Sequence, residues 1–375
     1  MGCSPSLDYE AYADCFAATQ HVTSHLRHES APWMSVLIPT YRRPELFREA
    51  LKSVLEQKPV SFAWEIVVLD NEPWDGSPNE TERFIASLAD GRIRYFRNSE
   101  NLRPGDNFNR GILLSRGQWV MMLHDDDMLL PNTLEKMGKA IRFLERRGSR
   151  PLGAVAAQYH CFAYDASRPH EKDEELRGVA DYYLNRPMSY RFFHLTHANV
   201  LFTGHPGGNI PSVGTTFSRR AVLDMGGFNE DLGICADLIL FYRLENRYRV
   251  YSTLEPYGFY RWGANTMIKY ESTHQTVKFC HDFREYVYRK SILHRLWGML
   301  FRSVHYYLFI LPVLEQRSLS SSSHVNFEDY ADIYAKKPGR RFFRFYRHSV
   351  LSLYRRIKHL EVKRLEKKAR KENLT

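Results

Sequence analysis

Short apolar runs alternate with amphipathic segments from residue 34 onward. The runs SVLIP (35–39), WEIVVLD (64–70), IRYFRN (93–98) and QWVMMLH (118–124) are rich in β-branched and aromatic residues, which predicts buried strands. Apolar residues repeat at helical spacing in the segments between them, 44–57, 81–90 and 105–117. Pro44 begins the first of these helices, and Gly91 is expected to end the second. This alternation predicts an α/β fold with a mostly parallel sheet and right-handed crossovers.

The pattern continues after residue 131, with longer gaps between its elements. It predicts a helix near 132–144, a strand at 152–158, strands within 247–262, and helices rich in aromatic residues from about 275. Residues 165–186 are dense in charge and are expected to leave the sheet as an excursion.

Polar residues follow the predicted strands at their carboxyl ends, where open α/β sheets bind ligands. Pro39, Thr40 and Tyr41 end the first strand, Asp70 ends the second, and the acidic run 125–127 follows the fourth. For Asp70 the competing interpretation is an Asx turn.

Asp125, Asp126 and Asp127 are three adjacent carboxylates that repel one another. They are expected either to form a solvated turn that caps the next helix, or to bind a divalent cation that relieves the repulsion. If side chains alternate at the strand end, Asp125 and Asp127 point the same way and Asp126 points the other.

Four motifs together resemble family 2 glycosyltransferases of the GT-A fold, which are inverting enzymes. They are VLIPTYRR (36–43), EIVVLDN (65–71), the stretch from Asn101 to Pro131, and GGFNEDLGICADLIL (226–240), and they occur in the order found in the family. The resemblance covers roughly 33–268. It implies a GT-A sheet with flanking helices, followed here by a helical, basic C-terminal extension.

The resemblance also implies roles for individual residues. Asp237 is expected to be the catalytic base that deprotonates the acceptor. Asp125 and Asp127 are expected to hold Mg²⁺ or Mn²⁺. Asp125 is also expected to contact the nucleotide-diphosphate sugar. The residues expected to bind this donor are Pro39, Thr40, Tyr41, Asp70, Arg103, Asp125 and Asp126.

Charge is concentrated at one end of the chain. The net charge is +10, and residues 336–375 contain 15 Lys and Arg against 3 Asp and Glu. Apolar residues repeat at near-helical spacing in this tail, which predicts a basic amphipathic helix on an anionic membrane surface. The alternative is a helix packed on the catalytic domain. Binding to nucleic acid is not expected, because no recognised module accompanies the charge.

Composition limits the setting of the protein. Five scattered cysteines suit a reducing compartment, and there is neither a secretory signal nor an apolar run of transmembrane length. We therefore expect a cytoplasmic enzyme, peripheral on the cytoplasmic face of the membrane. The predicted divisions are an extension (1–32), a GT-A domain (33–272) and a helical region with the basic tail (273–375).

The predicted activity is transfer of a sugar from a UDP-linked or similar donor to a glycan or lipid-linked glycan, with inversion, in surface polysaccharide biosynthesis. Two alternatives stay open at this point. One is a metal-dependent nucleotidyl or phosphoryl transferase that uses the same aspartates, and the other is a catalytically silent, membrane-associated binding subunit.

Overall fold

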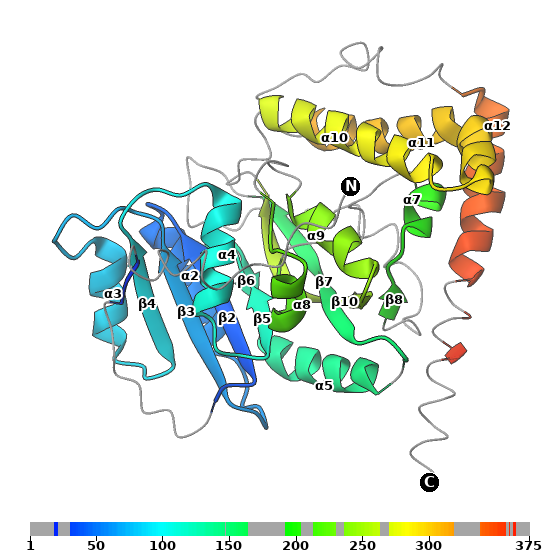
Figure 1. Ribbon diagram of the computed structural model, residues 1–375. Coiled ribbons are helices and arrows are strands. Elements are labelled where there is room, and N and C mark those ends of the chain that lie inside the picture. Colours follow the sequence, from blue (N-terminus) through cyan, green and yellow to red (C-terminus); the bar gives the residue numbers. More distant parts are fainter. Residues whose placement is uncertain are drawn as a thin grey trace, which may run out of the picture.

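The computed structural model is organised around one mixed sheet with helices on both faces (Figure 1). It describes residues 19–21, 31–146, 148–163, 192–203, 213–229, 236–262, 270–318, 338–357, 360 and 363–364. The strand order is β1-β4-β3-β2-β5-β9-β7-β10-β6, with β8 paired to β10. The charged segment 165–186 and the glycine-rich residues 204–212 lie outside the described residues.

Four parallel strands form the first half of the sheet, and each of their buried apolar runs is a run predicted above. They are β2 (Met34–Thr40), β3 (Trp64–Asp70), β4 (Ile93–Asn98) and β5 (Trp119–Met122). In the second half, the long strands β7 (Leu152–Ala163) and β10 (Arg249–Trp262) are parallel to each other. The short β9 (Thr216–Ser218) joins the halves by pairing antiparallel with both β5 and β7. The carboxyl ends of β2, β3, β4 and β5 therefore share one edge.

Helices cover the sheet because each presents an apolar face to it. One core contains α2 (Pro44–Leu55), α3 (Glu80–Leu88) and α5 (Thr133–Glu145). The other core contains α4 (Pro104–Leu114), α7 (Ala198–Thr203), α8 (Arg219–Asp224), α9 (Ala236–Glu245) and α10 (Tyr270–Tyr288). The result is a three-layer α/β arrangement.

The C-terminal region is helical, as predicted, and lies at one end of the molecule (Figure 1). It contains α10, the long α11 (Ile292–Ser318) and α12 (Arg340–Phe345), which continues through a π-helical turn (Tyr346–Val350) and a helical segment to residue 357. Phe283, Val287 and Tyr288 of α10 pack into the second core. The predicted division between residues 272 and 273 falls within α10, which packs on the sheet domain. The division stays a prediction.

One local expectation differs from the structure, and two short strands were not predicted. The second helix ends at Leu88 and is capped by Ala89, which adopts a left-handed backbone with φ 48°, and not by Gly91. The N-terminal extension contributes β1 (Thr19–His21), which pairs antiparallel with β4, since an edge strand offers unpaired backbone groups. A two-residue strand, β6 (Met128–Leu129), follows the acidic run and pairs with β10.

Candidate active site at the acidic turn

The acidic run forms a turn after β5 that is tied to the end of β2. Its backbone closes through a hydrogen bond from the Asp127 amide to the His124 carbonyl oxygen at 3.2 Å. The Thr40 hydroxyl donates to Asp125 Oδ2 at 2.9 Å, and the Tyr41 amide approaches the same oxygen at 3.4 Å. Strands β2 and β5 are adjacent and parallel, so their ends bring Thr40 and Asp125 together.

Arg43 bridges the first two carboxylates of the turn. Its Nη1 lies 3.1 Å from Asp126 Oδ2 and 3.6 Å from Asp125 Oδ1. The residue precedes α2, and 37% of its side chain is exposed. Arg43 thus offsets part of the repulsion within the turn, and its side chain still reaches solvent, from which a ligand would enter the site.

Asp127 points toward β10 instead. Its Oδ1 accepts a hydrogen bond from the Arg261 amide at 2.9 Å. The Arg261 side chain donates to the Asp126 carbonyl oxygen at 2.9 Å and to Glu49 Oε2 at 2.6 Å. The three residues form a turn and not the end of an extended strand, so Asp125 and Asp127 accept hydrogen bonds from different strands, β2 and β10.

Burial makes two of these carboxylates costly to ionise. Removal from water, followed by repulsion from Asp126, raises the pKa of Asp125 to about 6. The same two causes raise the pKa of Asp127 well above its usual range. A positive charge bound at the turn would therefore lower both pKa values and favour the ionised carboxylates.

The donor atoms fit a hard cation in their chemistry. Asp127 Oδ2 is buried and accepts no hydrogen bond from the part of the chain described. Within that part, no group of three or more His, Cys, Asp and Glu side chains is arranged as a metal site. Mg²⁺ is commonly held by one or two carboxylates together with substrate phosphates and water, which this turn satisfies without a further protein ligand.

Asp70 lies at the same edge, already surrounded by donors. Its Oδ2 accepts hydrogen bonds from Asn79 at 2.7 Å and Tyr95 at 2.8 Å, and its Oδ1 accepts from the Glu72 amide at 2.9 Å. Burial raises the pKa of Asp70. The bond to the Glu72 amide is the Asx turn considered above, so Asp70 already accepts three hydrogen bonds from the protein.

The remaining predicted residues lie on separate elements. Pro39 is half-buried within β2 beside Thr40. Arg103 precedes α4, is largely exposed, and pairs with Asp106 at 2.9 Å. Asp237 is half-buried in the first turn of α9, close enough to Cys280 for its charge to help raise the pKa of that thiol. The roles predicted for these residues stay predictions.

Sequence reasoning gave no role to Arg43 or Glu49 and no site role to Arg261. Arg43 was visible as part of the PTYRR motif, directly beside the strand end. Arg261 lies 134 residues from Asp127, and only the pairing of β6 with β10 brings them together.

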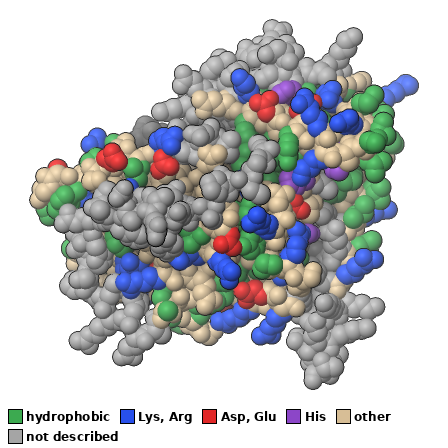
Figure 2. Space-filling model, viewed as in Figure 1, with side chains coloured by type: hydrophobic (Ala, Val, Ile, Leu, Met, Phe, Trp, Pro, Cys, Tyr) green, Lys and Arg blue, Asp and Glu red, His purple; other side chains and the backbone are tan. Residues whose placement is uncertain are grey.

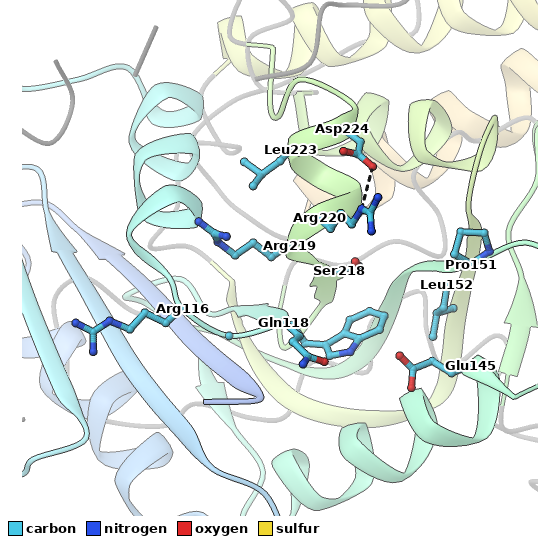
Figure 3. A pocket seen from close by; sticks show the side chains of 12 residues that line it. Arg116, Gln118, Glu145, Pro151, Leu152, Ser218, Arg219, Arg220, Leu223 and Asp224 are labelled. Atoms are coloured by element: carbon cyan, nitrogen blue, oxygen red, sulfur yellow. Dashed lines mark ion pairs between the residues drawn. The ribbon is translucent and has the colours of Figure 1, made fainter. Parts of the chain in front are cut away.

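A hollow of about 820 Å³ lies elsewhere on the molecule (Figure 3). Its lining includes Trp119 and Leu152, which begin β5 and β7, and Arg220 and Asp224 of α8. The acidic turn follows the other end of β5. The hollow is therefore separate from the candidate site.

Comparison with known proteins supplies the deciding observation. Residues 35–196, which include the acidic turn and the ends of β2 and β3, match the family model described as Glycosyl transferase family 2. This part of the chain is therefore similar to family 2 glycosyltransferases. The predicted resemblance and the GT-A type of α/β fold are thereby confirmed.

Individual relatives in this family are distant. An uncharacterized protein of Mycobacterium tuberculosis, MT1568, is 29% identical over 57% of this chain and 62% of its own length. A Campylobacter jejuni protein, GalNAc(5)-diNAcBac-PP-undecaprenol beta-1,3-glucosyltransferase, is 35% identical over 28% of this chain and 33% of its own. The chain thus spans less than two thirds of each.

Among solved structures, a mannosyltransferase from Pyrobaculum calidifontis in complex with GDP-Man and Mn²⁺ is 17% identical. It aligns over 80% of each chain with a TM-score of 0.49. This degree of likeness identifies neither a donor nor a metal for the present chain.

Proposed function

We propose that this protein is a family 2 glycosyltransferase that moves a sugar from a nucleotide-diphosphate donor, UDP-linked in the first instance, to a glycan or lipid-linked glycan. The proposed setting is the biosynthesis of surface polysaccharide or glycolipid. The observation that carries the proposal is the buried acidic turn at the carboxyl edge of the sheet, where Asp127 Oδ2 accepts no hydrogen bond from the described residues.

We assign the diphosphate end of the donor to this turn. Asp125 and Asp127 would hold Mg²⁺ or Mn²⁺, which when bound stabilises the negative charge of the departing diphosphate. Arg43 can turn from Asp126 toward the phosphates, since it lies at the rim of the turn. Pro39, Thr40, Tyr41 and Asp70 would line the nucleoside, and Arg103 would approach the diphosphate from α4.

Asp237 is proposed as the base that takes the proton from the acceptor hydroxyl. General-base catalysis of this kind contributes about 10²–10⁴-fold to the rate. A single displacement at the anomeric carbon would invert its configuration. Support comes from the position of Asp237 in the first turn of α9, within the family motif that ends at residue 240.

A thermal-shift screen of nucleoside diphosphates with and without Mn²⁺ tests the donor assignment, because a ligand that binds the folded form raises Tm. We expect a metal-dependent rise with one base. Product analysis then tests the reaction. Release of nucleoside diphosphate with transfer supports the proposal, whereas release of monophosphate and pyrophosphate would identify a nucleotidyl transferase.

Asp237→Asn tests the proposed base, with Asp282→Asn as the matched control on the exposed side of α10. The first variant should keep the donor-induced shift and lose transfer by about 10²–10⁴-fold. The control should retain both. Full transfer by Asp237→Asn would remove Asp237 from the mechanism.

We also propose that the basic C-terminal region contacts an anionic membrane peripherally, which would bring the site to a lipid-linked acceptor. Among the described residues, no helix combines the length and apolar character needed to cross a bilayer. One side of the tail packs on the body, since Tyr346, Leu351 and Tyr354 are buried. The opposite side remains available.

A further inference from the structure

Exposed large hydrophobic side chains are confined almost entirely to two helical segments. In the described part of the chain, Tyr41 at the candidate site is the one such residue outside them. The others lie on α11 and on the C-terminal helix that includes α12: Ile292, Leu293, Leu296, Met299, Leu300, Phe342, Phe345, Leu353, Ile357 and Leu360. We call these ten residues the apolar face.

The α11 part of the apolar face is distinct from the side of α11 that holds the fold together. Its members follow helical spacing, and Leu293 and Met299 are 77% and 76% exposed. The other side packs inward: Gly298 lies so close to the Tyr288 ring that a Cβ there would be 2.7 Å from it, and Val304 is fully buried. The exposed residues are therefore not needed for packing.

The two parts of the apolar face adjoin one aromatic contact. Phe301 of α11 stacks on Phe342 with ring centroids 5.8 Å apart, and it also packs on Tyr346 at 4.8 Å. Leu300 precedes Phe301 and is exposed, as is Phe345 beside Tyr346. Figure 2 shows hydrophobic side chains gathered along this edge of the molecule, with Lys and Arg beside them.

The two helical segments that carry the apolar face are basic, and one of their cations, Arg302, pairs with Glu285 of α10. Residues 289–314 include Arg289, Lys290, Arg295 and Arg302 and contain no Asp or Glu. Residues 338–360 contain seven Lys and Arg and again no Asp or Glu. Aliphatic side chains flanked by cations match the interface of a bilayer with anionic headgroups. A symmetric pairing of two copies through this face would set these cations against one another.

We propose that the apolar face is the bilayer-docking surface of the protein, with α11 contributing an insertion site beside the basic tail. Ile292, Leu293, Leu296, Met299 and Leu300 enter the acyl boundary, and the flanking arginines meet anionic headgroups. This inference deepens the proposed peripheral membrane contact and rests on it. It assigns the hydrophobic contacts with the bilayer to α11 as well as to the C-terminal helix.

Vesicle flotation of the full chain tests the assignment, with phosphatidylcholine vesicles that contain or lack phosphatidylglycerol. We expect binding to the mixed vesicles that weakens with salt, and weak binding to pure phosphatidylcholine. The double variant Leu293→Gln/Met299→Gln should lower the partition coefficient about ten-fold or more. Arg295→Glu should lower it by roughly five-fold for each unit of charge. Lys52→Glu, an equal charge change on the exposed side of α2, is the matched control and should change it little.

Donor-induced thermal shifts, measured on the same variants, separate the two proposals. Unchanged donor shifts with lost flotation support the docking surface. Flotation that is insensitive to the α11 changes would overturn it, whatever the donor result, and absent donor binding with normal flotation would contradict only the proposed activity. Light scattering supplies a further check: a dimer that the double variant abolishes would identify the occupant as a second copy and refute the inference.

Discussion

Asp125→Asn should stabilise the metal-free protein at neutral pH. The pKa of Asp125 is raised from an ordinary 3.8 to about 6, and each pKa unit corresponds to about 1.4 kcal/mol. Keeping Asp125 ionised therefore costs the folded state about 3 kcal/mol. The variant removes this cost, and its amide oxygen can still accept the hydrogen bond from Thr40. The raised pKa already includes the attraction of Arg43, so the net gain is about 3 kcal/mol.

The sign of this effect depends on pH. Because the folded form of Asp125 binds its proton more tightly than the unfolded form, wild-type stability falls as pH rises from about 4 to about 6 and then levels off. The variant lacks this titration. The difference in the free energy of unfolding should therefore be full at pH 7.5 and absent near pH 4.

Thermal melts in EDTA measure the difference. For 375 residues, an unfolding entropy of about 2.1 cal/mol/K per residue gives a rise in Tm of about 3–4 °C at pH 7.5. Asp106→Asn removes an exposed carboxylate paired with Arg103 and serves as the control, with an expected change of about 1 °C or less. Added Mn²⁺ should raise Tm more for wild type than for Asp125→Asn. Equal or lower stability of the variant at pH 7.5 would refute the conclusion that the ionised Asp125 carboxylate destabilises the metal-free turn.

Three further perturbations test the same site. Mn²⁺ binding to the wild type, followed by calorimetry, should weaken below about pH 6, because protons compete for Asp125 and Asp127; a flat profile from pH 5 to 8 would contradict this. Arg43→Ala should lower Tm without metal, since it removes the cation nearest two carboxylates, and Mn²⁺ should narrow the gap from wild type. Gly258→Ala should cost about 1–3 kcal/mol in denaturant unfolding, because a Cβ there would lie 2.5 Å from the Met128 carbonyl oxygen, and an unchanged midpoint would show that β6 yields freely.

The sequence predicts what depends on local periodicity and on the order of elements. The strands that end in Thr40, Asp70 and the acidic run were located from their apolar runs, so the edge of the sheet that carries the candidate site could be named in advance. The direction of each carboxylate could not. It depends on partners such as Arg261, which a short antiparallel pairing brings from a distant part of the chain.

The tail illustrates a different reason for incomplete prediction. Its periodicity suggested either packing on the body or exposure to a membrane, and the structure assigns opposite sides of one helix to packing and to exposure: Tyr346 and Tyr354 are buried, whereas Leu353 and Ile357 are exposed. Periodicity shows that apolar residues line the helix, but it does not show which of them pack on the rest of the protein and which are exposed. That distinction required the aromatic contacts made by Phe301.

The acidic turn and the C-terminal helices are also joined by one strand. The Arg261 amide holds Asp127, and its side chain holds the Asp126 carbonyl oxygen, so the last residues of β10 fix the direction of the turn. In chain order, β10 ends at Trp262 and α10 begins at Tyr270. Helix α10 packs into the second core through Phe283, Val287 and Tyr288. A displacement of β10 would therefore change the carboxylate geometry before it disturbed the hydrogen bonds between β2, β3 and β4. Changes to the C-terminal helices that shift β10 should thus weaken Mn²⁺ binding more than they lower Tm.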